Sequence, residues 1–163
     1  MPMVPFDAMP DDARVWVFAA DRPLSGEDER QMLSAVDNAL SDWHAHGEPL
    51  TAARDWRDGR FLAIGVDQRT AGASGCSIDG MFRTLKGLEQ KLRTSLTAGG
   101  RVFFREEGGT IRGVGRDDFE ALAGAGTVGK DTRVFDTSIT SAGAWRQRFE
   151  LEAGSSWHAS LIA

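Results

Sequence analysis

The sequence predicts an α+β protein with a ferredoxin-like split β-α-β arrangement, and three observations lead to that fold. Two apolar runs, residues 14–20 and 60–66, carry apolar side chains on both alternating faces, as strands buried on both sides do. An amphipathic stretch with helical spacing follows each run. Asp58-Gly59, between residues 50–56 and 60–66, is a strong signal for a tight hairpin. The predicted element order is therefore β-α-β-β-α-β.

The first strand and helix are predicted from periodicity and capping. In residues 14–20, Val15 and Val17 alternate with Trp16 and Phe18, so both faces of the strand are apolar. Ser25 is a candidate N-cap for a helix over residues 25–45. Gly47 and Pro49 end this helix, whose apolar positions are Met32, Leu33, Val36, Leu40 and Trp43.

The second helix is predicted over residues 78–96, and Gly99 and Gly100 separate it from a fourth strand at 102–104. We expect the first and third strands to be central in the sheet and parallel to each other. The two helices then cover one sheet face. The other face must be covered by residues 105–163 or by a second subunit, because an apolar face of this size is not left in water.

The C-terminal third is predicted as an irregular α/β extension. It comprises a strand at 110–114, a helix from Asp117 to Leu122, a strand at 133–139, a short helix containing Trp145 and a last strand at 157–162. The chain then divides into a surface arm at 1–13, a ferredoxin-like domain at 14–104 and an extension at 105–163 that packs on this domain.

Composition excludes several classes of function. The 163 residues carry a formal net charge of −5, which argues against a large phosphate-binding surface, so no nucleic-acid partner is expected. No run approaches the ~20 apolar residues of a membrane helix, and the start has no basic, apolar leader. The single cysteine forms no internal disulfide. We therefore expect a cytoplasmic protein that does not bind membranes.

Four segments along the chain carry a resemblance to a known family: Val15–Val17, Trp43–Gly47, Gly72–Asp79 and Ser156–His158. The chain resembles a family of small uncharacterised bacterial proteins, some of which are labelled ATPases of ABC transporters. This sequence has no Gly-x-x-x-x-Gly-Lys-Ser/Thr motif: the stretch Gly72–Gly80 contains no lysine, and none of the three lysines, Lys86, Lys91 and Lys130, is followed by Ser or Thr within such a motif. The resemblance implies a bacterial protein and no settled activity.

A second resemblance is local and covers residues 102–135. Val102–Phe104, Gly108-Gly109, Gly113, Phe119 with Leu122, Gly126–Val128 and Thr132–Phe135 are similar to the bacterial variant of a GYF-type peptide-binding module. The resemblance implies that proline-rich peptides dock on an aromatic platform. Val114 stands where that pattern has proline and Phe135 where it has tryptophan, so the aromatic docking surface is expected to be smaller in this chain.

The stretch Gly72–Gly80 is the predicted functional site. It lies between a buried strand and a helix, and it contains the only cysteine of the chain. Cys76 near a helix N-terminus is a candidate nucleophile, because the helix dipole favours the thiolate, although a small buried residue at a turn is the structural alternative. Ser74, Gly75 and Ser77 are candidates for an anion-binding nest, and Ser77 is equally an N-cap.

Charged residues are predicted to surround this loop. Asp79 stands in the first helical turn, where a carboxylate complements the dipole. Arg69 in the same loop and Arg22 after the first strand would add positive charge, because loops that follow two parallel strands share one sheet edge. Alternatively, both arginines are solvated surface residues with no role in a site.

The histidines are sorted by distance from Cys76. His44 and His46 end a helix that we expect to start at the cysteine edge and run away from it for about 30 Å, so they are excluded as its base. His158 is the histidine that can reach Cys76, and tail packing is its alternative role. No metal-ligand set and no cofactor motif is recognised.

Three functions remain open at this point. The chain is a binding protein for a small molecule, an anion or another protein; a thiol-dependent enzyme that uses Cys76; or a structural subunit that forms a homodimer through the open sheet face. A binding protein is favoured, because no complete catalytic constellation is present.

Overall fold

The computed structural model describes residues 3–69 and 71–162, and within them the chain is an α+β protein with four α-helices and three small antiparallel sheets. The chain divides into two compact units. Unit 1 comprises residues 1–97 and 139–146, and unit 2 comprises residues 98–138 and 147–163. No helix in the described ranges is both long and apolar enough to cross a membrane.

The sheet of unit 1 has the order β1 (Arg14–Ala19), β5 (Phe61–Val66), β4 (Ala52–Arg57). All six residues of β5 are buried, as the run of apolar side chains predicts. The predicted hairpin between β4 and β5 is confirmed. Asp58 and Gly59 have φ of +57° and +65°, and the Arg60 N–H donates to the Arg57 carbonyl over 3.0 Å, as a type I′ turn requires.

The predicted direction of the two apolar strands is wrong. They are neighbours, but β1 and β5 are antiparallel, with Val15 opposite Gly65. The connections explain this direction: the helix after β1 brings the chain back so that β4 points the same way as β1, and the hairpin then reverses β5. The ferredoxin-like topology is not confirmed, because the predicted fourth strand lies in the sheet of unit 2.

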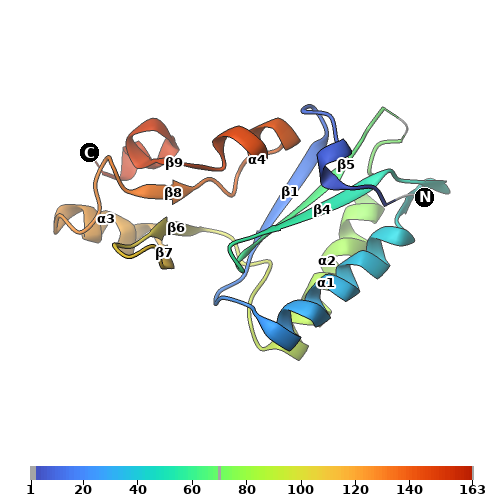
Figure 1. Cartoon of the computed structure of the whole chain (residues 1–163), viewed down its shortest axis with the longest axis horizontal. Coiled ribbons are helices and arrows are strands. Elements are labelled where there is room, and N and C mark those ends of the chain that lie inside the picture. Colours follow the sequence, from blue (N-terminus) through green and yellow to red (C-terminus); the bar gives the residue numbers. More distant parts are fainter. Residues whose placement is uncertain (1–2, 70, 163) are drawn as a thin grey trace. The chain divides into compact units, whose positions relative to one another are not determined.

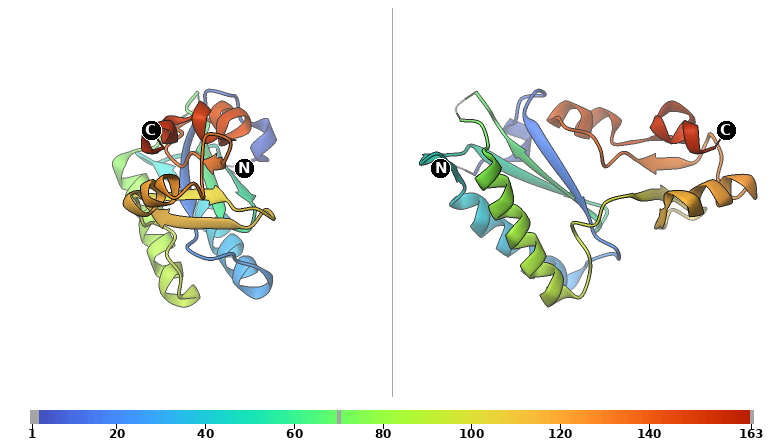
Figure 2. Two further views of the ribbon diagram at one scale, coloured as in Figure 1. Left: turned by 90° about the vertical axis from the view of Figure 1, so that its left-hand side faces the viewer. Right: turned by 180° about the vertical axis from the view of Figure 1, so that it is seen from behind.

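Two helices, α1 (Gly26–Ser41) and α2 (Gly75–Leu92), lie side by side over one face of this sheet (Figures 1 and 2). The buried side chains between sheet and helices include Leu62, Ile64, Val36 and Leu85. The segment between α1 and β4 forms a short hairpin that the sequence did not predict, from β2 (His44–Ala45) and β3 (Glu48–Pro49).

The opposite sheet face is covered by two other segments of unit 1, one near the N-terminus and one at residues 139–146. The segment at 139–146 contributes the start of α4 (Ala142–Arg148), and Trp145 is fully buried there. Its Nε1 donates to Asp55 on β4 over 2.8 Å. The predicted surface arm is a second part of this cover, because Phe6 in a 3₁₀ turn (Phe6–Ala8) and Met9 are buried. The prolines of this segment favoured the prediction of an exposed arm, so the burial of Phe6 and Met9 was not predicted.

Unit 2 contains a four-stranded sheet with the order β7 (Ile111–Gly115), β6 (Arg101–Arg105), β8 (Arg133–Phe135), β9 (Glu150–Glu152). The helix α3 (Arg116–Gly124) follows β7 directly. Two 3₁₀ helices, Ala153–Ser155 and Trp157–Leu161, end the described chain. Core side chains include Val102, Phe104, Phe119 and Val134.

Two predicted strands of unit 2 differ from the structure. Residues 157–161 form a 3₁₀ helix instead of a strand, because the Ser156 hydroxyl accepts the His158 N–H and starts a helical turn. The strand predicted at 133–139 ends at Phe135, where the Asp136 carboxylate accepts the Ser138 N–H over 3.0 Å and forms a turn.

Candidate functional site

The predicted loop before α2 is built as a helix cap. Ser74 is the N-cap and accepts the Ser77 N–H over 3.1 Å, while the Ser77 hydroxyl accepts the Ser74 N–H over 3.2 Å. This reciprocal pair is a capping box, in which serine takes the place of the usual glutamate. It moves the helix start to Gly75, three residues before the predicted one. Both hydroxyls are therefore engaged in starting α2.

The same turn also joins α2 to the end of α1. The Ser77 hydroxyl donates to the His44 carbonyl over 2.6 Å, and Trp43 Nε1 donates to the Ser77 carbonyl over 2.7 Å. The predicted separation of His44 from Cys76 is therefore wrong. Because β1 and β5 are antiparallel, α1 starts at one sheet edge and ends at the edge where α2 begins.

The remaining predicted residues of this loop are exposed. Gly75 and Cys76 lie in the first turn of α2, whereas Asp79 follows that turn, in contrast to the prediction, because the helix begins at Gly75; all three residues are exposed. Within the two described ranges, no group of three or more His, Cys, Asp or Glu side chains is placed to hold a metal ion. Cys76 belongs to unit 1 and His158 to unit 2, so their catalytic pairing stays a prediction.

The two arginines predicted to flank the loop are not together. Arg69 donates to Asp67 through Nη2 and Nε, over 2.7 and 2.9 Å. These hydrogen bonds hold the pKa of the Asp67 carboxyl below its usual range, so this cation is already paired. Arg22 donates to the carbonyl of Leu92, the last residue of α2, and pairs with Asp28. It therefore lies about 27 Å from the start of that helix.

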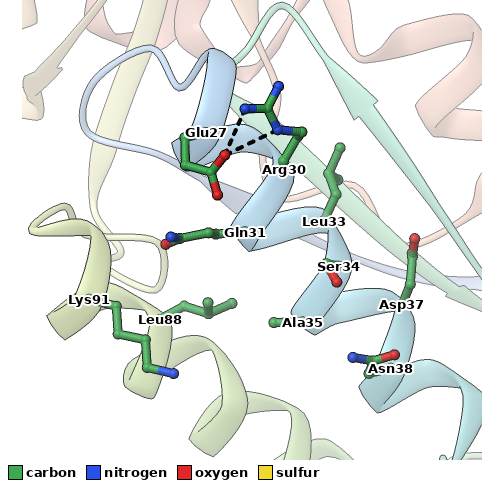
Figure 3. Close-up of a pocket in the computed structure, with 10 residues that line it drawn as sticks. All are labelled: Glu27, Arg30, Gln31, Leu33, Ser34, Ala35, Asp37, Asn38, Leu88 and Lys91. Atoms are coloured by element: carbon green, nitrogen blue, oxygen red, sulfur yellow. Dashed lines mark hydrogen bonds and ion pairs between the residues drawn. The ribbon is translucent and has the colours of Figure 1, made fainter.

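A groove of about 870 Å³ runs along α1 and α2 (Figure 3). Its charged side chains are largely paired within the protein. Glu27 and Arg30 form an ion pair at 2.6 Å, and Asp37 forms one with Arg54 at 2.8 Å. The lining of the groove also includes small or aliphatic side chains such as Ala35 and Leu88.

A second cavity, of about 460 Å³, lies in unit 2, and we call it the Trp157 cavity. It is lined by two arginines, one carboxylate, two hydroxyls, one tryptophan and a glycine: Arg101, Arg116, Asp136, Thr137, Ser138, Trp157 and Gly100. Trp157 is 37% exposed and is the exposed large apolar side chain among the described residues.

Arg116 is held against Trp157. Its guanidinium carbon lies 4.9 Å from the centre of the indole ring, a distance typical of a cation–π interaction. Arg116 is the first residue of α3, where the helix dipole adds positive potential. In the described part of the chain, Arg116 forms no ion pair with a carboxylate. Its cationic charge is thus positioned but not neutralised.

His158 supports the tryptophan from inside unit 2. Its ring is stacked on Trp157 with centres 4.0 Å apart, and its Nδ1 shares a hydrogen bond with the Ser156 hydroxyl over 2.7 Å. Burial lowers the pKa of His158 to about 4; the Asp136 charge opposes this shift, and the Arg116 charge adds to it. His158 is therefore neutral at pH 7, and its Nε2 has no hydrogen-bond partner among the described residues.

Sequence reasoning missed Arg116 as a site residue and placed Trp157 in a predicted last strand. Arg116 and Trp157 are some 40 positions apart, so no local motif connects them. One signal was present: Arg116 stands directly before the helix predicted from Asp117, where its guanidinium and the unpaired backbone N–H groups of a first helical turn can donate to the same anion. Only the folded unit brings this cation onto the indole ring.

The comparisons with known proteins add no function to this geometry. No family model, no curated protein and no solved structure shows a significant match to the chain. The features of the molecule that bear on function are therefore the two cavities and the loop before α2.

Proposed function

We propose that the chain is a binding protein that recognises an anionic group in the Trp157 cavity of unit 2. The observation that carries this proposal is the state of Arg116: its guanidinium is held on the indole ring and has no carboxylate partner among the described side chains. A guanidinium presents a planar set of N–H donors that fits a carboxylate or a phosphate.

The surrounding groups favour an anion. Arg101 also lines the cavity, and the Thr137 hydroxyl adds hydrogen-bond capacity, whereas the Ser138 hydroxyl already donates to Asp136. Stacking on Trp157 fixes the orientation of Arg116 before a ligand arrives, which reduces the conformational entropy lost on binding. Asp117 and Asp118 stand in the same helical turn and reduce the local positive potential, so a direct contact with Arg116 is needed.

The alternatives receive less support. The loop before α2 uses its hydroxyls as a cap and its arginine in an ion pair, so it offers fewer free groups to an anion. A homodimer was proposed to form through an uncovered face of the unit 1 sheet. That alternative is less well supported, because Trp145 and Phe6 cover this face. A thiol-dependent reaction at Cys76 remains an alternative that needs a partner base.

The proposal is tested by titrating phosphate, glutarate and N-acetylglutamate into ¹⁵N-labelled protein at constant ionic strength. We expect the signals of the Trp157 indole N–H and the Arg116 side chain to shift with a saturable dependence. Arg116→Gln should abolish the shift. Arg112→Gln is the matched control, because Arg112 is also an exposed arginine of unit 2 and lies outside the cavity.

Two results would contradict the proposal. One is the absence of any shift up to about 10 mM of all three anions, which corresponds to a binding free energy too small for recognition. The other is an equal loss of response in Arg112→Gln, which would mean that the anions act on the general charge of unit 2.

A further inference from the structure

The size and exposure of the Trp157 cavity bear on the kind of ligand it takes. Its volume of about 460 Å³ lies in the range of sites for organic ligands and exceeds what one inorganic anion fills. Its rim is open, however, because Arg116, Ser138 and Trp157 are all exposed. Sites for small molecules usually enclose most of the ligand surface. An open site suits a segment of a larger chain that makes further contacts outside the cavity.

The chemistry of the lining narrows the ligand further. Arg116 and Arg101 attract an anion, while Asp136 in the same cavity can accept a hydrogen bond from an N–H group. A peptide supplies both, because an acidic side chain is always accompanied by backbone N–H donors. The exposed part of the indole ring adds an apolar surface next to the cation. His158 and Arg116 already contact that ring, so a ligand side chain has to lie beside them.

We propose that the ligand of the Trp157 cavity is an exposed peptide segment of another protein, in which an aspartate or glutamate is flanked by an apolar residue. The carboxylate binds the guanidinium of Arg116, and the apolar neighbour lies along the indole of Trp157. This inference rests on the proposed anion-binding function and adds the class of partner.

The test uses the full chain and a set of blocked heptapeptides, in which a central Glu is flanked by each apolar residue type in turn and by Ser elsewhere. Each peptide has a partner with Gln in place of Glu, and N-acetylglutamate is the free-acid probe. Dissociation constants are measured by calorimetry. We expect the best Glu peptide to bind about tenfold more tightly than its Gln partner, as a charge-assisted hydrogen bond predicts.

The variants locate the effect. Arg116→Gln should remove the difference between Glu and Gln peptides, and Arg116→Lys should retain part of it, because lysine keeps the charge but not the planar donors. Trp157→Ala should weaken peptide binding, and the dissociation constant should no longer depend on which apolar residue flanks the Glu. Arg112→Gln should leave all constants unchanged. Arg116 is exposed, and an unaltered unfolding curve of its variants shows that they fold.

The outcomes separate the two proposals. If N-acetylglutamate binds as tightly as the best peptide, the partner is a small acid and the peptide inference is overturned, while anion binding stands. If the Gln peptides bind as well as the Glu peptides, recognition of a peptide carboxylate is overturned. If neither the peptides nor the three free anions bind, both proposals fail.

Discussion

The two helices that begin beside the candidate sites, α2 in unit 1 and α3 in unit 2, differ in how their first turns are satisfied. At α2 the reciprocal bonds of Ser74 and Ser77 close the turn, and the nearby Arg69 is paired with Asp67. At α3 the N-cap is Gly115, which forms no side-chain cap bond within the described chain, and Arg116 has no acidic partner there. The polar side chains at the start of α2 are thus engaged in capping, whereas the charged start of α3 has no side-chain cap and leaves Arg116 available to a ligand.

The largest expected effect concerns the joint at the start of α2. Trp43 is 7% exposed and donates to the Ser77 carbonyl, so Trp43→Ala should lower the free energy of unfolding by about 3–5 kcal/mol. Trp157→Ala, its matched control in unit 2, should cost about 1 kcal/mol or less, because Trp157 is exposed. Urea denaturation followed by circular dichroism measures both. If both variants lost a similar free energy of unfolding, Trp43 and Trp157 would not differ as a structural and an accessible tryptophan.

A smaller effect should appear as pH dependence in unit 2. His158 has a folded pKa of about 4, below the value of about 6.5 expected for the unfolded chain. The unfolded state therefore binds a proton first as pH falls. Stability should be full above pH 6.5 and decline by about 2–3 kcal/mol between pH 6.5 and 4. Denaturation midpoints at several pH values measure this decline.

His158→Leu serves as the control for that decline, because it removes the titrating ring and keeps an apolar side chain in the core. The slope between pH 6.5 and 4 should become flatter in this variant. An unchanged slope would mean that groups other than the histidine cause the pH dependence.

The smallest effect comes from exchanging the caps. Ser74→Ala should cost about 1 kcal/mol, because the Ser77 N–H loses its acceptor. Gly115→Ser should stabilise unit 2 by a few tenths of a kcal/mol, since a hydroxyl at the N-cap satisfies a first-turn N–H. Thermal unfolding measures both changes. A destabilising Gly115→Ser would mean that the start of α3 is already satisfied.

Local patterns were sufficient for most elements of the fold. The Asp58-Gly59 turn, the apolar run of β5, the amphipathic α2 and the short helix around Trp145 all follow from spacing and turn chemistry, which act between near neighbours in the chain. The hairpin at His44–Pro49 and the short strand β9 were missed, because a strand of two or three residues is too short to show an alternating pattern of apolar and polar side chains.

By itself, the sequence determined the α+β class, the cover of one sheet face by two amphipathic helices, and a polar turn before α2. Only the tertiary structure decided the antiparallel direction of β1 and β5, which separates Arg22 from Arg69 and brings His44 to Ser77. It also decided that Arg116 meets Trp157. The physical reason is range: capping and periodicity are local, whereas strand direction and a cation on a distant ring depend on how remote segments pack.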